Sequence, residues 1–143
     1  MHIVTTGVSN HSGDMDLNPE TYGLIHENDP ESTSEHPRPM TWQLVEYPAS
    51  GNIQYQFQTG ANPYWTSFWV RNHSLPLSKV EVKSVNHADW FELRRETDGT
   101  YNDDGGFGEG AFQLQLTALT GDVVVDDQPG FTAGALEPST QQF

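Results

Sequence analysis

Residues 64–71 read Tyr-Trp-Thr-Ser-Phe-Trp-Val-Arg, and this stretch is the clearest indication of a β fold in the chain. Its aromatic and β-branched residues favour an extended strand. Side chains alternate between the two faces of a strand, so Phe68 and Val70 share one face, which we assign to a hydrophobic core. Trp65 and Trp69 share the other face. The pattern predicts a strand that covers a core and carries two large aromatic side chains on its outer side.

Further strand-like segments follow at short, regular spacing. They lie at residues 78–84, 90–96, 111–119 and 121–126. Turn-forming sequences separate them, among them Asn72-His73-Ser74, Asp98-Gly99 and Thr120-Gly121. Several short strands separated by such turns predict an antiparallel β-sandwich. Trp42 and Trp90 lie in apolar strand patterns, and we assign both to a core.

The sequence before residue 64 has a different organisation. Residues 52–58 alternate and predict another strand, with glutamines at every second position on one face. Gly60, Asn62 and Pro63 then interrupt the chain, and we place a domain boundary between residues 60 and 61. Residues 1–60 contain few large apolar side chains, so we expect them to be the end of a domain and not a whole one.

The charge of the chain excludes some partners. Twenty acidic residues face six basic ones, which gives a formal net charge of −14 over 143 residues. Binding of nucleic acid requires Lys and Arg to displace counterions, so nucleic acid is excluded, and an anionic membrane is excluded for the same reason. A neutral polysaccharide is compatible with any net charge. There is no cysteine, and the six histidines lack metal-ligand spacing, so we expect no metal and no cofactor.

Four segments, in this order and spacing, resemble the expansins. Residues 13–19 (Gly-Asp-Met-Asp-Leu-Asn-Pro) resemble the strand-to-helix corner late in the first expansin domain. Residues 40–45 (Met-Thr-Trp-Gln-Leu-Val) and 51–55 (Gly-Asn-Ile-Gln-Tyr) are similar to the strands that close that domain. Residues 64–73 are similar to the strand that opens the second domain. Each segment is short, and the specificity of the match lies in their order.

The resemblance implies a two-domain, all-β architecture. Expansins combine a double-psi β-barrel with an immunoglobulin-like β-sandwich, which is a family 63 carbohydrate-binding module. We therefore expect the C-terminal part of a barrel at residues 1–60 and a complete sandwich at residues 61–143. The resemblance also implies a secreted, extracellular monomer that binds cellulose or a related plant or microbial wall polysaccharide. Residues 1–10 lack the pattern of a signal peptide, so we expect that signal to be absent from this chain.

The expected binding residues are aromatic. A planar ring pressed on the flat, apolar face of a sugar removes apolar surface from water. Tyr64 and Trp65 match two of the three binding aromatics of the family. The third position is Asp98 here, so we assign Tyr101, three residues later, as its substitute. Strand alternation adds Trp69 as a fourth binding residue.

The resemblance also concerns catalysis. Asp16 matches the Asp that expansins share with family 45 endoglucanases, where it is the general acid. Glycoside hydrolysis requires two carboxylates that flank one bond. Asp14 would lie about 7 Å from Asp16 but on the same side of a strand, which is a poor geometry.

We therefore expect Asp16 to be a remnant acid in a protein that loosens walls and is not an enzyme. Two alternatives stay open. The chain could be an isolated carbohydrate-binding module without loosening activity, or a weak endoglucanase that uses Asp14 and Asp16.

Overall fold

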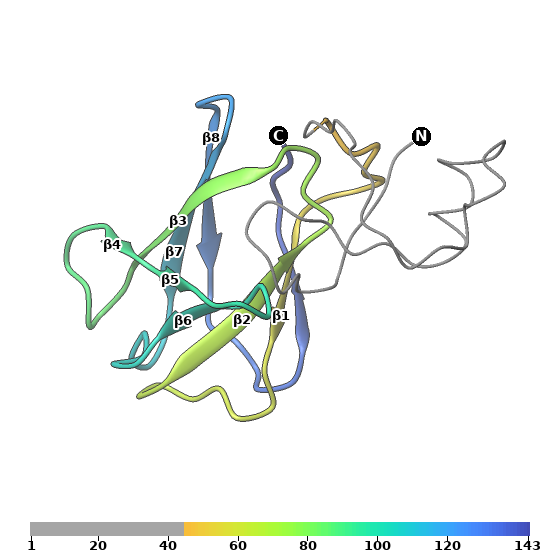
Figure 1. The fold of residues 1–143 in the computed structure, drawn as a ribbon. Coiled ribbons are helices and arrows are strands. Elements are labelled where there is room, and N and C mark those ends of the chain that lie inside the picture. Colours follow the sequence, from red (N-terminus) through yellow and green to blue (C-terminus); the bar gives the residue numbers. More distant parts are fainter. Residues whose placement is uncertain (1–44) are drawn as a thin grey trace, which may run out of the picture. The chain divides into compact units, whose positions relative to one another are not determined.

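The computed structural model describes residues 45–143, which form nine β-strands and no helix (Figure 1). The strands are β1 (Gln54–Phe57), β2 (Thr66–Arg71), β3 (Leu77–Lys83), β4 (Phe91–Glu92), β5 (Arg94–Arg95), β6 (Tyr101–Asp103), β7 (Phe112–Ala118), β8 (Val123–Gln128) and β9 (Leu136–Pro138). The all-β prediction is confirmed for this part of the chain. Nothing helical within residues 45–143 is long and apolar enough to cross a membrane.

The strands form two sheets. One sheet has five strands in the order β5-β6-β2-β1-β9, and the other has four in the order β4-β3-β7-β8. Every pairing is antiparallel. The two sheets lie in separate layers around a shared core (Figure 1). The predicted antiparallel sandwich is therefore present.

Phenylalanine side chains from both sheets fill the core. Phe57 of β1 stacks on Phe131 with ring centroids 4.3 Å apart, and it lies 5.1 Å from Phe68 of β2. Phe112 of β7 meets Phe57 edge-on at 6.3 Å. Burial alternates along β7, as expected for a strand with one face on a core. This packing determines which side chains of β2 can reach the surface.

The expected domain boundary at residues 60 and 61 is wrong for the part of the chain that the structure describes. β1 pairs with both β2 and β9, so it is a central strand of the sandwich. Ile53, Tyr55 and Phe57 are among the most buried side chains of the core. The compact unit runs from Leu44 to Phe143.

Several predictions concern residues outside the described range. These are the barrel itself, Asp16 as a remnant acid and Trp42 as a core residue. The other tryptophan assigned to a core, Trp90, lies within the described range. Trp90 is 36% exposed and lies in the connection between β3 and β4, so its assignment to the core is wrong.

Candidate functional site

The outer side of the five-stranded sheet carries the aromatic residues that the sequence singled out. Thr66, Phe68 and Val70 of β2 are buried, and the opposite side of the strand carries Trp69, which is partly exposed, and Arg71, which is exposed. Ser67 also lies on that side but is only 2% exposed. The neighbouring strands place polar side chains beside Trp69 and Arg71, because Gln56 is paired with the former and Gln54 with the latter. We call this surface the aromatic face, and define it by Trp65, Trp69, Arg71, Gln54, Gln56 and Leu136.

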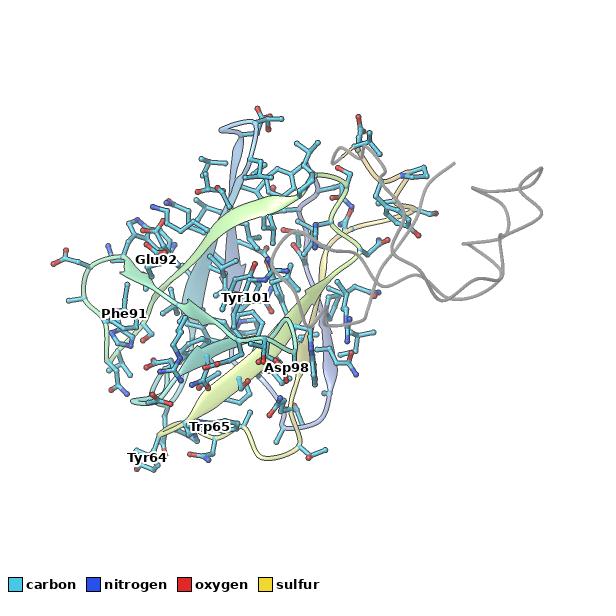
Figure 2. All side chains as sticks on the ribbon, in the orientation of Figure 1. Tyr64, Trp65, Phe91, Glu92, Asp98 and Tyr101 are labelled. Atoms are coloured by element: carbon cyan, nitrogen blue, oxygen red, sulfur yellow. The ribbon has the colours of Figure 1, made fainter. Side chains whose placement is uncertain are left out.

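Tyr64 and Trp65 stand at one end of this face, at the corner that leads into β2 (Figure 2). Tyr64 is 75% exposed, and Trp65 is half-buried. Asn62 holds the corner in place, since its main-chain N–H donates to the carbonyl of Trp65 at 2.8 Å and its side chain accepts from the N–H of Tyr64 at 2.9 Å. The two aromatic side chains are thus presented by a fixed turn.

Trp69 lies farther along β2, next to Asp98, which occupies the position of the family's third aromatic in this chain. The indole N–H of Trp69 donates to the main-chain carbonyl of Asp98 at 3.2 Å. The carboxylate of Asp98 accepts hydrogen bonds from the N–H and the hydroxyl of Thr100, and these bonds lower the pKa of Asp98. The turn that carries Asp98 therefore supplies no ring of its own but fixes the orientation of Trp69.

Tyr101 is not available to a ligand on this face. It is 6% exposed and is paired with Phe68, with ring centroids 6.3 Å apart. Burial also raises the pKa of its hydroxyl. Tyr101 lies on the inner side of β6, whereas the next residue, Asn102, is paired with Ser67 on the outer side. The assignment of Tyr101 as a binding residue is therefore corrected.

Four members of the aromatic face were missed as site residues by the sequence analysis: Arg71 of β2, and three residues from neighbouring strands. Gln54, Gln56 and Leu136 come from β1 and β9, which flank β2 only after folding. The amide oxygen of Gln56 accepts a hydrogen bond from Nε of Arg71 at 3.1 Å. Side-chain amides can both donate to and accept from sugar hydroxyls. The alternating glutamines of residues 52–58 were the available signal.

Acidic side chains are scarce here, although the chain has 20 of them. Neither β1 nor β2 contains one. Asp104, near Trp65, receives hydrogen bonds from Asn102 at 2.7 Å and from Arg94 at 3.1 Å. These bonds, that of Asn102 first, hold the pKa of Asp104 below its usual value. Its charge is thus paired with a guanidinium, so the face carries less negative charge than the chain as a whole.

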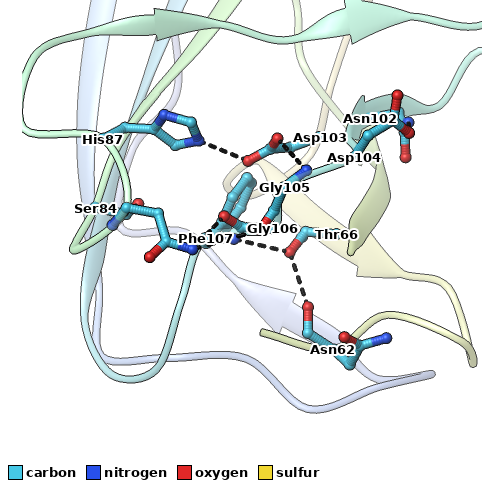
Figure 3. A network of polar contacts seen from close by, with 11 residues as sticks. Asn62, Thr66, Ser84, His87, Asn102, Asp103, Asp104, Gly105, Gly106 and Phe107 are labelled. Carbon is cyan, nitrogen blue, oxygen red and sulfur yellow. Dashed lines mark hydrogen bonds and ion pairs between the residues drawn. The ribbon is translucent and has the colours of Figure 1, made fainter. Parts of the chain in front are cut away.

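A network of polar contacts supports the corner from behind (Figure 3). The hydroxyl of Thr66 donates to the carbonyl of Asn62 at 3.2 Å and accepts from the N–H of Phe107 at 3.3 Å. Asp103, which is almost fully buried, contacts the ring of His87 at 2.7 Å. These contacts link the corner to the loop after β6.

Gly106 provides a test of this support. A Cβ on Gly106 would lie 2.3 Å from the carbonyl oxygen of Pro63, and its φ is +68°. We expect Gly106→Ala to lower the free energy of unfolding by about 3 kcal/mol, because the backbone of the corner must move.

Gly105→Ala is the matched control for this change. Its new Cβ would come no closer than 3.5 Å to any atom, and Gly105 has no positive φ. Thermal melting measured on both variants checks the prediction. Equal behaviour of the two variants would contradict it.

Metal chemistry finds no support in the described region. Among residues 45–143 no group of three or more His, Cys, Asp or Glu side chains converges to hold an ion. The aromatic face therefore offers rings, amides and one guanidinium.

The sequence of the chain was compared with those of known proteins. No family model matches the chain. Expansin-like protein 6 of Dictyostelium discoideum is 23% identical over 104 residues, which cover 73% of this chain and 36% of that protein. Expansin-YoaJ of Bacillus subtilis is 26% identical over 117 residues, which cover 82% of this chain and 47% of that protein. The chain is expansin-like.

Solved structures agree in fold with this expansin-like chain. Crystal structures of the Clavibacter michiganensis expansin, without ligand and as a mutant in complex with cellohexaose, match at a TM-score of 0.61 and 19% identity. The match covers 68% of this chain and 48% of that one. At this identity the likeness concerns the fold alone. The expansin-like chain spans less than half the length of the relatives named here.

Proposed function

We propose that this expansin-like chain binds cellulose or a related wall glucan on its aromatic face, and that it loosens wall contacts without hydrolysis. The proposal rests on Trp69 of β2 and on Trp65, which lies four residues earlier and by strand alternation on the same side, with Tyr64 exposed beside it. Four residues of strand separate the two tryptophans by about 13 Å. A row of this length suits several linked sugars better than one.

The chemistry of the face fits a neutral glucan. A ring that covers about 60 Å² of apolar sugar surface contributes about 1.5 kcal/mol. Gln54 and Gln56 lie beside the rings and can bond to the equatorial hydroxyls at the edges of the sugars. Such bonds contribute about 1 kcal/mol each and restrict the orientation of the chain. In this arrangement the rings contribute most of the binding free energy, and the amides fix the orientation of the glucan chain.

The relatives support the same class of ligand. The Clavibacter michiganensis expansin is described in complex with cellohexaose, a short glucan. We extend this ligand class to the present chain because its sandwich has the same fold and presents aromatic side chains on one face. Secretion, a monomeric state and wall loosening are proposed on the same ground.

The absence of hydrolysis is proposed from the site. Hydrolysis requires an acid and a second carboxylate on opposite sides of one bond. The carboxylate of Asp104 near Trp65 is paired with Arg94, and its lowered pKa makes it a poor proton donor. Asp16 lies outside the described residues, and we retain it as the candidate remnant acid.

The experiment combines three measurements on one preparation. We expect the protein to be depleted from solution by amorphous cellulose, to weaken cellulose paper, and to release no reducing sugar. Asp16→Asn should abolish the weakening of paper and leave depletion unchanged. Reducing-sugar release above the blank would favour the endoglucanase alternative. Depletion without any weakening of paper would favour an isolated binding module.

A further inference from the structure

We infer that the aromatic face takes a neutral β-1,4-linked backbone that carries a uronic acid side group, and that Arg71 binds the carboxylate of that group. The inference rests on the proposed function, because it assumes that a polysaccharide lies along β2. It adds a chemical preference which rings and amides alone do not supply.

Arg71 is placed at the end of the aromatic row that lies opposite Tyr64. Its guanidinium carbon lies 5.1 Å from the centre of the Trp69 ring, within the range of a cation–π contact. Its Nε donates to the amide oxygen of Gln56 at 3.1 Å. Two contacts therefore hold an exposed guanidinium in one orientation beside Trp69.

This contact changes what Trp69 offers to a ligand. The guanidinium covers part of the ring, and the turn that carries Asp98 and Gly99 borders it. A sugar that reaches this end of the row meets a cation next to the ring. At the other end, Tyr64 is open and Trp65 lies beside it. The two ends of the row thus differ in chemistry.

The charge of Arg71 has no partner among residues 45–143. Every carboxylate found within 4.0 Å of an arginine there contacts Arg94, which bonds to both Glu96 and Asp104. Arg71 keeps the terminal nitrogens of its fork free of hydrogen bonds to other described residues. A planar guanidinium with free nitrogens matches a carboxylate, which it can bind through two parallel hydrogen bonds.

The number of charges decides which acidic sugar fits. The aromatic face supplies one cation, Arg71, which has no carboxylate partner among residues 45–143, in a chain of formal net charge −14. A backbone made wholly of uronic acids would bring one negative charge with every residue and would be repelled by this field. A neutral backbone with an isolated acidic branch brings one carboxylate to one guanidinium. This ratio favours a substituted glucan or xylan over a polyuronate.

The test compares two oligosaccharides of equal length by calorimetry on the whole chain. One is a neutral xylo-oligosaccharide, and the other carries a single glucuronic acid. We expect the acidic form to bind about tenfold more tightly at low salt, and the difference to shrink as salt screens the exposed pair. Arg71→Gln should abolish the difference between the two oligosaccharides.

Arg95→Gln is the matched control. Arg95 is another exposed arginine of the same sheet, but its guanidinium lies 6.0 Å from the ring of Tyr101, on the inner side of β6. This variant loses the same charge and should keep the preference. Loss of preference in both variants would mean that net charge alone is responsible and would overturn the inference.

Other outcomes are equally decisive. Equal affinity of the two oligosaccharides for the natural chain would overturn the inference, as would a preference that survives Arg71→Gln. An oligogalacturonate that binds as tightly as the singly substituted form would overturn it as well. The variant Trp65→Ala distinguishes a failure of the inference about Arg71 from a failure of the proposed glucan binding. If Trp65→Ala weakens both ligands while no preference exists, only the role of Arg71 fails; if it weakens neither, the aromatic face itself fails.

Discussion

Replacement of Tyr64 and Trp65 together by alanine should lower the affinity for cellulose by about 100-fold. Tyr64 is 75% exposed and Trp65 is half-buried, so both rings can cover sugar surface. At about 1.5 kcal/mol for each ring, the two losses sum to about 3 kcal/mol. Neither side chain belongs to the hydrophobic core, so the fold should persist. Depletion isotherms on amorphous cellulose measure the change.

Trp90→Ala is the matched control for this prediction. Trp90 is also exposed, but it lies between β3 and β4, in the part of the fold that belongs to the other sheet. Its removal tests whether any exposed tryptophan gives cellulose binding. We expect unchanged affinity for Trp90→Ala, and similar thermal melting for all three proteins. Unchanged depletion of the Tyr64 and Trp65 double variant would refute the central role of the aromatic face.

Local alternation was a reliable guide to β2. The sequence placed Phe68 and Val70 in a core, and both are buried. Alternation works here because β2 is flanked on both sides in its sheet and covered on one face by the other sheet. Its inner and outer faces are therefore in different environments. The outward direction of Trp69 follows from the same parity.

The prediction for Tyr101 was wrong because it came from counting three residues onward from Asp98, the family position, and not from strand alternation. β6 is only three residues long, and its direction is set by pairing with β2. That pairing places Tyr101 opposite Phe68 and puts Asn102 on the other side of the sheet, where it is also buried. A register between strands far apart in the sequence cannot be obtained from local periodicity. The glutamines of β1 were missed as site residues for the same reason.

The domain boundary failed because of turn chemistry. Gly60, Asn62 and Pro63 are typical of linkers, but they are also typical of tight turns between paired strands. In the structure they connect β1 to β2, and Asn62 pairs with Trp65 within the turn. Only long-range pairing distinguishes the two cases. Here that pairing assigns β1 to the sandwich.

The position of β1 gives the second large prediction. A fragment that begins at residue 44 should fold, whereas one that begins at residue 61 should not. The shorter fragment lacks the strand between β2 and β9, together with Ile53, Tyr55 and Phe57. Loss of one buried aromatic side chain costs about 3–5 kcal/mol, while a small domain is stable by about 5–15 kcal/mol in total. Loss of three buried side chains and two rows of pairing therefore costs at least as much as the total stability of a small domain.

Near-UV circular dichroism and cooperative thermal melting distinguish the two fragments. Phe57→Ala in the longer fragment gives an intermediate case, because it removes the ring that stacks on Phe131 at 4.3 Å but keeps the strand. We expect this variant to fold with a free energy of unfolding lower by about 3–5 kcal/mol. A cooperative transition in the fragment from residue 61 would mean that β9 and β2 can close the core alone. In that case β1, although paired with β2 and β9, would not be required for the sandwich to fold.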